Sequence, residues 1–162
     1  MTEGEPMNPL KQLQQYGQAV WMDYISRKMI TSGDLRRLID HDGVTGLTSN
    51  PAIFEKAIDE SADYDDELKK LLDADAGIQA PAIYEKLSVD DIRMAADTLR
   101  PVHGRTRGAD GYVSIEVSPR LAKNTEESTF GAGKGLALVS TRASKVSSCC
   151  LISRSHSAIN FW

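Results

Sequence analysis

Three short apolar segments of this chain each end in side chains that can bind a hydroxyl or move a proton. Asp23 follows the apolar run of residues 19–22, and Asn50 follows VTGLT and Ser49. Glu116 lies near the end of YVSIEVS, residues 112–118. Carboxylates can exchange protons with a substrate, and amides can hydrogen-bond its hydroxyls. The three endings therefore predict one shared site, provided that the fold brings the segment ends together.

Each of these side chains also has a structural interpretation. Asp23 could cap the helix that follows it, and Asn50 could cap a helix that begins at Pro51, because Asn before a Pro at the first helical position is ordinary helix-start chemistry. Glu116 could form a salt bridge at the edge of a sheet. The arrangement of the segments decides between the two interpretations.

The apolar segments alternate with helical patterns, which predicts a parallel sheet covered by helices. A helix is expected to begin at Thr31 or Ser32, and another at Pro51. Ser88 and Asp91 resemble a capping box, which predicts a helix separate from the one over residues 81–87.

Two α/β architectures fit this alternation, namely a doubly wound sheet and a (β/α)8 barrel. A dinucleotide-binding sheet needs a glycine-rich turn after its first strand, but no glycine lies between Asp23 and Gly33. A barrel needs polar groups at the C-terminal strand ends, and all three segments supply them. The barrel is therefore the predicted architecture.

The third strand has an apolar and a polar face, because side chains alternate along a strand. If the apolar face meets the helices, Glu116 faces the barrel interior. A carboxylate there is costly unless it is hydrogen-bonded or has a task. The predicted apolar face consists of Val113, Ile115 and Val117, and the polar face of Tyr112, Ser114, Glu116 and Ser118.

Several segments carry a resemblance to a known family. NPLKQLQQYGQAVWMDYI, GVTGLTSNPAIFEKAI, SADYDDEL and DGYVSIEVSPRLAKNTE resemble the N-terminal part of bacterial transaldolases, of the longer subfamily that also occurs fused to phosphoglucose isomerase. The resemblance covers about residues 7–127. It implies the first three parallel strands of a (β/α)8 (TIM) barrel, with their covering helices.

The resemblance also implies an activity and roles for the three residues. Transaldolases transfer a dihydroxyacetone unit from sedoheptulose 7-phosphate to glyceraldehyde 3-phosphate in the pentose phosphate pathway, through a Schiff base on a lysine. Asp23 matches the family's proton-exchanging aspartate, Asn50 matches the asparagine that binds the dihydroxyacetone unit, and Glu116 matches the glutamate that works through a water. No metal or organic cofactor is implied.

The Schiff-base lysine itself has no counterpart in this chain. The family carries it on the next strand, in a sequence like MIKVPAT, but residues 129–150 read TFGAGKGLALVSTRASKVSSCC. Lys134 and Lys145 do not lie in an apolar strand that would lower the pKa of the amine. We therefore expect an incomplete barrel that is inactive alone, or alternatively a non-catalytic fragment that self-associates.

The composition changes at the same place. All 23 acidic residues precede residue 128, whereas the last 35 residues contain four basic residues and eight serines. We expect residues 1–127 to form the partial barrel and residues 128–162 to be an atypical tail that packs poorly. The tail is either a non-native continuation, for example from an altered reading frame, or a natural flexible segment.

The overall composition excludes several classes of function. A net charge of −4 argues against a nucleic-acid partner, because phosphate binding needs clustered Lys and Arg. No apolar run approaches the length of a membrane span. The two cysteines, Cys149 and Cys150, are adjacent, which suits neither a metal site nor a disulfide framework. We therefore expect a cytoplasmic protein, and the resemblance to transaldolases implies that its partners are sugar phosphates.

Overall fold

The computed structural model of this chain describes residues 8–115. Glu116 and the predicted tail over residues 128–162 lie outside these residues, and so does the predicted boundary between the two segments.

Three parallel strands form one sheet in the order β1-β2-β3. β1 spans Val20–Asp23, β2 spans Val44–Ser49 and β3 spans Val113–Ile115. Each strand pairs with the next one along the chain, and helices occupy both connections. This is the arrangement at the start of a (β/α)8 barrel, and it confirms the predicted class of fold.

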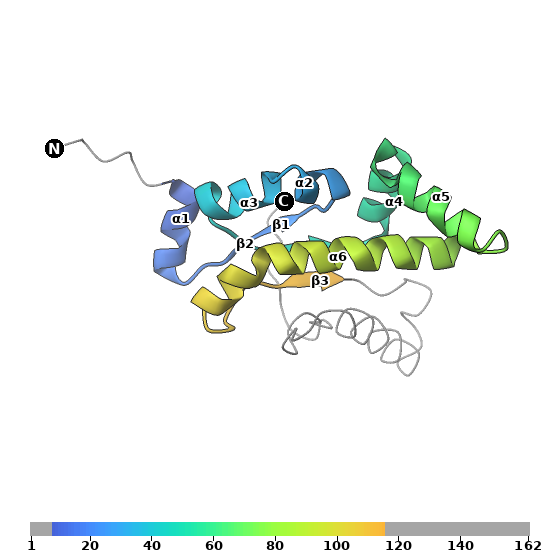
Figure 1. Cartoon of the computed structure of the whole chain (residues 1–162). Coiled ribbons are helices and arrows are strands. Elements are labelled where there is room, and N and C mark those ends of the chain that lie inside the picture. The colour runs from blue at the N-terminus through green and yellow to red at the C-terminus, as the bar shows by residue number, and fades with distance from the viewer. Residues whose placement is uncertain (1–7, 116–162) are drawn as a thin grey trace.

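Helices lie along the sheet and at both of its ends (Figure 1). α1 lies at one end of the sheet, α4 and α5 lie at the other end, and the long helix α6 runs along it. The helical elements are α1 (Pro9–Leu13), η1 (Gln14–Tyr16), α2 (Arg27–Thr31), α3 (Asp34–Arg37), the π-helical η2 (Leu38–Asp42), α4 (Pro51–Asp59), η3 (Ala62–Tyr64), α5 (Asp65–Ala74) and α6 (Ala80–Arg105).

The predicted capping box is wrong, because α6 is one helix of 26 residues that runs through it. Ser88 and Asp91 are both buried inside this helix. The Ser88 hydroxyl donates a hydrogen bond to the Glu85 carbonyl oxygen (3.2 Å), so this buried hydroxyl is paired within its own helix. No Gly or Pro lies between residues 82 and 100 to interrupt the helix.

One face of the sheet forms the core with the helices. Met22, Leu47 and Val113 are aligned across the three strands, and all three pack in the same apolar cluster. The helices supply its other members, among them Met29, Leu35, Phe54, Ile92 and Leu99. Side chains one residue along each strand must point to the opposite face.

A register shift between Val20 and Trp21 brings Trp21 opposite Gly46. A Cβ added to Gly46 would lie 2.6 Å from Cδ2 of Trp21, so the indole ring packs directly on the glycine. The indole Nε1 donates to Oδ1 of Asp110 (3.0 Å), in the turn before β3. Trp21 therefore lies across the face of the sheet opposite the core and links its two edges.

The residues on either side of α1 attach it to the chain just before β2 by polar contacts. The Gln14 side-chain amide donates to the Gly43 carbonyl oxygen (2.9 Å), and the Asn8 amide donates to Oδ1 of Asp42 (2.9 Å).

Within residues 8–115, no helix combines the length and the apolar character that crossing a membrane requires.

Candidate functional site

Three polar side chains form a row across the sheet, on the face opposite the core. Asp23 is aligned with Thr48, and Thr48 is aligned with Ser114. All three lie next to core residues along their strands, so alternation places them on the other face. The row lies near the C-terminal ends of the strands, where parallel βα units place their functional groups.

Asp23 is exposed and is held by its neighbour in the row. The Thr48 hydroxyl donates a hydrogen bond to Oδ1 of Asp23 (2.5 Å). Asp23 does not cap the following helix, because the side chain of Ser26 accepts from the backbone N–H of Met29 at that position. The structural interpretation of Asp23 as a cap is therefore wrong, and its second carboxylate oxygen has no partner among the described residues.

Asn50 follows β2 directly and caps α4. Its Oδ1 accepts a hydrogen bond from the backbone N–H of Ile53 (3.0 Å), and Pro51 occupies the first helical position. The capping interpretation is therefore confirmed. Because Oδ1 accepts this bond, the other end of the amide is the Nδ2 group. Its two N–H donors have no partner within the described part of the chain.

Glu116 was predicted to face the same site, and it lies outside the described residues. The alternation on which that prediction rests holds inside β3 for Val113 and Ser114, but it is wrong for Tyr112, which was predicted on the polar face and packs against the apolar core just before the strand begins. Val113 is 1% exposed and packs in the core, whereas Ser114 belongs to the polar row. The Ser114 carbonyl oxygen also accepts a hydrogen bond from the Ser49 hydroxyl (2.8 Å), which ties the end of β2 to β3.

Sequence reasoning missed a tryptophan that lies beside the polar row, on the same face of the sheet. Trp21 is two residues before Asp23 on the same strand and therefore on the same face. It is half-buried, and it packs on Gly46, which is two residues before Thr48. A Trp and a Gly on neighbouring strands give a weak signal of this contact, because the register shift that aligns them is not visible in the sequence.

The lysines of the described chain are all on helices. Lys11, Lys28, Lys56, Lys69, Lys70 and Lys86 lie on α1, α2, α4, α5 and α6. None of them belongs to the polar row. Nor do residues 8–115 contain a group of three His, Cys, Asp or Glu side chains that could hold a metal ion.

Two substitutions of Asn50 should separate its capping group from its free donors. Asn50→Ala removes the acceptor and is expected to lower the free energy of unfolding by about 1 kcal/mol. Asn50→Asp keeps an acceptor at the cap and should retain nearly all of the stability, while it removes the Nδ2 donors. Urea denaturation followed by circular dichroism measures both. Equal losses for the two variants would show that the cap bond contributes nothing.

Comparison with known proteins gives one consistent family. Residues 20–146 match the family described as transaldolase/fructose-6-phosphate aldolase. The chain is 48% identical over 119 residues to transaldolase 2 of Nostoc punctiforme and 49% identical over 123 residues to a transaldolase of Trichodesmium erythraeum. It is 48% identical over 128 residues to transaldolase 2 of Streptomyces coelicolor.

The matches cover most of this chain and a minor part of each relative. They include 74% of the chain for the first two relatives and 79% for the third. The same segments make up 31%, 31% and 34% of the relatives' own lengths. The chain thus spans about a third of the curated proteins that it matches.

Proposed function

Because the chain belongs to the transaldolase/fructose-6-phosphate aldolase family, we propose that its polar row is one part of a transaldolase site. The reaction proposed for the complete site transfers a dihydroxyacetone unit from sedoheptulose 7-phosphate to glyceraldehyde 3-phosphate. Erythrose 4-phosphate and fructose 6-phosphate are the products. The observation that carries this proposal is the row itself, because Asp23 and Thr48 meet at neighbouring strand ends on the face away from the core.

Asp23 is the proposed proton-exchanging group. As the carbon–carbon bond of the sugar breaks, the neighbouring hydroxyl must lose its proton, and a carboxylate within reach can accept it. The exposure of Asp23 supports this role. The hydrogen bond from Thr48 to Oδ1 leaves the second oxygen for the substrate.

Asn50 is the proposed ligand of the dihydroxyacetone unit. Its Oδ1 is used by the α4 cap, which fixes the direction of the amide, and the Nδ2 donors can bind hydroxyl or carbonyl oxygens of the sugar. Capping and substrate binding are therefore compatible in one side chain. Glu116 is the third proposed residue, and it acts through a water molecule during formation and hydrolysis of the imine.

The reaction also needs a lysine amine that attacks the ketone, and we propose that this chain alone lacks it. All lysines of the described residues are on helices, and Lys134 and Lys145 lie in a sequence unlike the family's lysine strand. Acid–base groups that act together with a nucleophile contribute little without it.

The proposed location of the protein, on the basis of its family, is the cytoplasm.

A second proposal is a non-catalytic role with self-association. Within residues 8–115, β1 and β3 each pair with one strand only, so each has a free edge. Free strand edges can pair with another chain. Light scattering tests the second proposal, because a monomer excludes self-association. An activity assay tests what both proposals expect, which is no turnover by this chain alone.

Trapping with borohydride tests whether this chain forms an imine. After incubation of the chain with fructose 6-phosphate and reduction, we expect no dihydroxyacetone adduct on any lysine, because no lysine of residues 8–115 lies at the polar row and the family's lysine strand has no counterpart in the sequence. Intact-mass and peptide mass spectrometry make the measurement. The transaldolase 2 of Nostoc punctiforme, treated in the same way, is the positive control.

A stoichiometric adduct on Lys134 or Lys145 would contradict the prediction. It would show that the segment after residue 127 supplies the nucleophile, and the proposed inactivity of this chain would then be wrong.

A further inference from the structure

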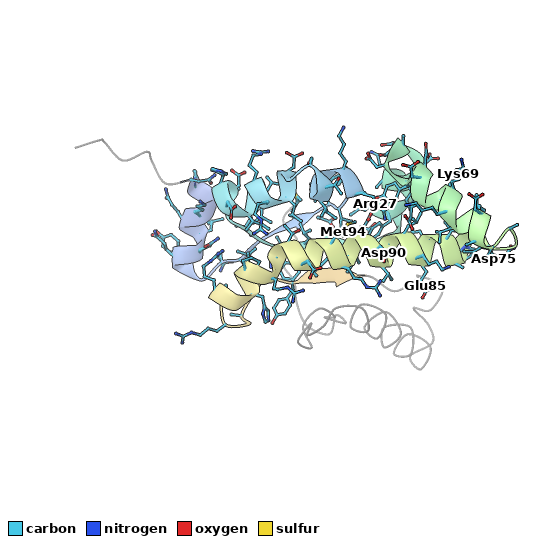
Figure 2. All side chains as sticks on the ribbon, viewed as in Figure 1. Arg27, Lys69, Asp75, Glu85, Asp90 and Met94 are labelled. Atoms are coloured by element: carbon cyan, nitrogen blue, oxygen red, sulfur yellow. The ribbon has the colours of Figure 1, made fainter. Side chains whose placement is uncertain are left out.

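Three polar side chains from three separate elements meet below the surface, away from the polar row. Arg27 is the first residue of α2, Tyr64 is the last residue of η3, and Asp91 lies near the middle of α6. Figure 2 labels Arg27 where α2 approaches α6. Asp91 is 0% exposed and Tyr64 is 1% exposed. We call these three residues the clamp.

Both carboxylate oxygens of Asp91 and the hydroxyl of Tyr64 have hydrogen-bond partners within the clamp. Nε of Arg27 donates to Oδ1 of Asp91 (2.8 Å), and the Tyr64 hydroxyl donates to Oδ2 of Asp91 (2.6 Å). The backbone N–H of Arg27 donates to the Tyr64 hydroxyl oxygen (3.2 Å). The guanidinium carbon of Arg27 lies 4.7 Å from the centre of the Tyr64 ring, which adds a cation–π contact.

Burial changes the acid–base properties of the clamp. It raises the pKa of Asp91, an effect that the hydrogen bonds from Tyr64 and Arg27 partly offset. Burial, together with the hydrogen bond to Asp91, also raises the pKa of Tyr64, so its hydroxyl keeps its proton and remains a donor. A buried ion pair is often no more stabilising than apolar residues of the same volume. What it adds is a fixed geometry among three elements.

The clamp joins the two segments that leave the polar row. Arg27 lies four residues after Asp23, and between them Ile25 is 0% exposed. Tyr64 lies in η3, which packs against both α2 and α4. The first turn of α4 is the one that Asn50 caps. Movement of α2 therefore acts on the end of β1 through residues 24–26, whereas movement of η3 reaches Asn50 along α4, because Tyr64 packs with Ala57 in the second half of that helix.

We propose that Arg27, Tyr64 and Asp91 are positioning residues, which hold the ends of β1 and β2 so that Asp23 and Asn50 keep a constant separation. This inference rests on the proposed function, because that function gives the two residues a common substrate. None of the three clamp residues belongs to the polar row. Their effect passes through the α2 and α4 segments.

The substitution Tyr64→Phe in the full 162-residue chain tests the proposal. It removes one hydroxyl, so that Oδ2 of Asp91 and the backbone N–H of Arg27 lose their partner, while the ring and its packing stay. The matched control is Tyr84→Phe. Tyr84 is partly buried and its ring packs against that of Phe54, but its hydroxyl has no hydrogen bond within the described residues.

The readout is amide hydrogen exchange at two cap positions and one position in the sheet. The Ile53 and Met29 amides donate to the caps Asn50 and Ser26, and the Leu47 amide donates within the sheet to the Tyr112 carbonyl oxygen. Tyr64→Phe should accelerate exchange at Ile53 and Met29 roughly tenfold, with Leu47 much less affected. The side-chain amide resonances of Asn50 should shift as well. The control should change none of these signals.

Two results would overturn the proposal. Equal acceleration at all three amides would mean that the clamp stabilises the whole fold without positioning the strand ends. No acceleration at Ile53 and Met29 would mean that the clamp is not connected to the strand ends at all.

Addition of fructose 6-phosphate separates this inference from the proposed function. If the sugar shifts the Asn50 side-chain amide in the unsubstituted chain, Tyr64→Phe should weaken that binding several-fold and Tyr84→Phe should not. Unchanged binding in Tyr64→Phe would contradict the clamp. If the sugar does not bind the unsubstituted chain, the proposed function fails for this chain. The exchange measurement still decides whether the clamp positions the ends of β1 and β2.

Discussion

Replacing Arg27 with methionine is expected to lower the free energy of unfolding by about 3–5 kcal/mol, because removing one partner of a buried ion pair leaves the other uncompensated. The Asp91 side chain is 0% exposed and that of Arg27 is 14% exposed, so water cannot replace the lost partner. Methionine keeps most of the volume of the side chain, which limits the change to charge and hydrogen bonding. Urea denaturation followed by circular dichroism measures the loss.

A second ion pair of this chain provides the control. Arg37 and Asp34 approach to 3.9 Å with side chains that are 62% and 56% exposed. Arg37→Met should therefore change the stability by no more than about 0.5 kcal/mol. Combining Arg27→Met with Asp91→Leu should recover much of the loss, because no charge then remains buried. Equal stability of the Arg27→Met and Arg37→Met variants would contradict the importance of the buried pair.

The substitution Gly111→Ala is expected to cost about 3 kcal/mol or more, from two causes that add. Gly111 has a φ of +95°, a conformation that residues with a side chain rarely adopt. A Cβ at this position would also lie 2.6 Å from the Cα of His103, in the backbone of α6, which cannot rotate away. Gly111 precedes β3, and its N–H donates to the Thr45 carbonyl oxygen (3.0 Å). Thermal unfolding followed by circular dichroism checks the loss.

Gly33→Ala isolates the contribution of backbone conformation. Gly33 has a similar φ of +86°, but a Cβ there would meet nothing within 4 Å. Its cost should be about 1 kcal/mol, which is the ordinary cost of a left-handed conformation. If the two alanine variants lose the same stability, the close approach of Gly111 to α6 has no energetic effect.

The strands could be predicted from the sequence because their patterns are local. The apolar segments over residues 19–22 and 44–48 were expected as strands, and β1 and β2 occupy Val20–Asp23 and Val44–Ser49. The alternation in the third strand was also sufficient to assign Val113 to the core. The single helix α6 was not predicted, because a capping box read from Ser88 and Asp91 has the same residue types as two polar positions inside a helix.

The contacts that organise the candidate site could not be predicted, because they depend on register and on distant partners. Thr48 reaches Asp23 only because a shift after Val20 realigns the two strands. Asp91 finds Tyr64 across 27 residues and Arg27 across 64 residues. An Arg, a Tyr and an Asp are common residues, and no spacing in the sequence relates them.

The clamp also has a consequence for the order in which the chain folds. β3 pairs with β2 through Leu47 and Val113, which are 66 residues apart, so direct pairing must close a long loop. Once Asp91 has docked on Arg27 and Tyr64, only 22 residues separate this anchored point from Val113. By the logarithmic dependence of loop entropy on length, this lowers the cost of closure by about 1 kcal/mol. Asp91 is also synthesised before β3, so the first two strands and α6 can assemble while β3 is still within the ribosome.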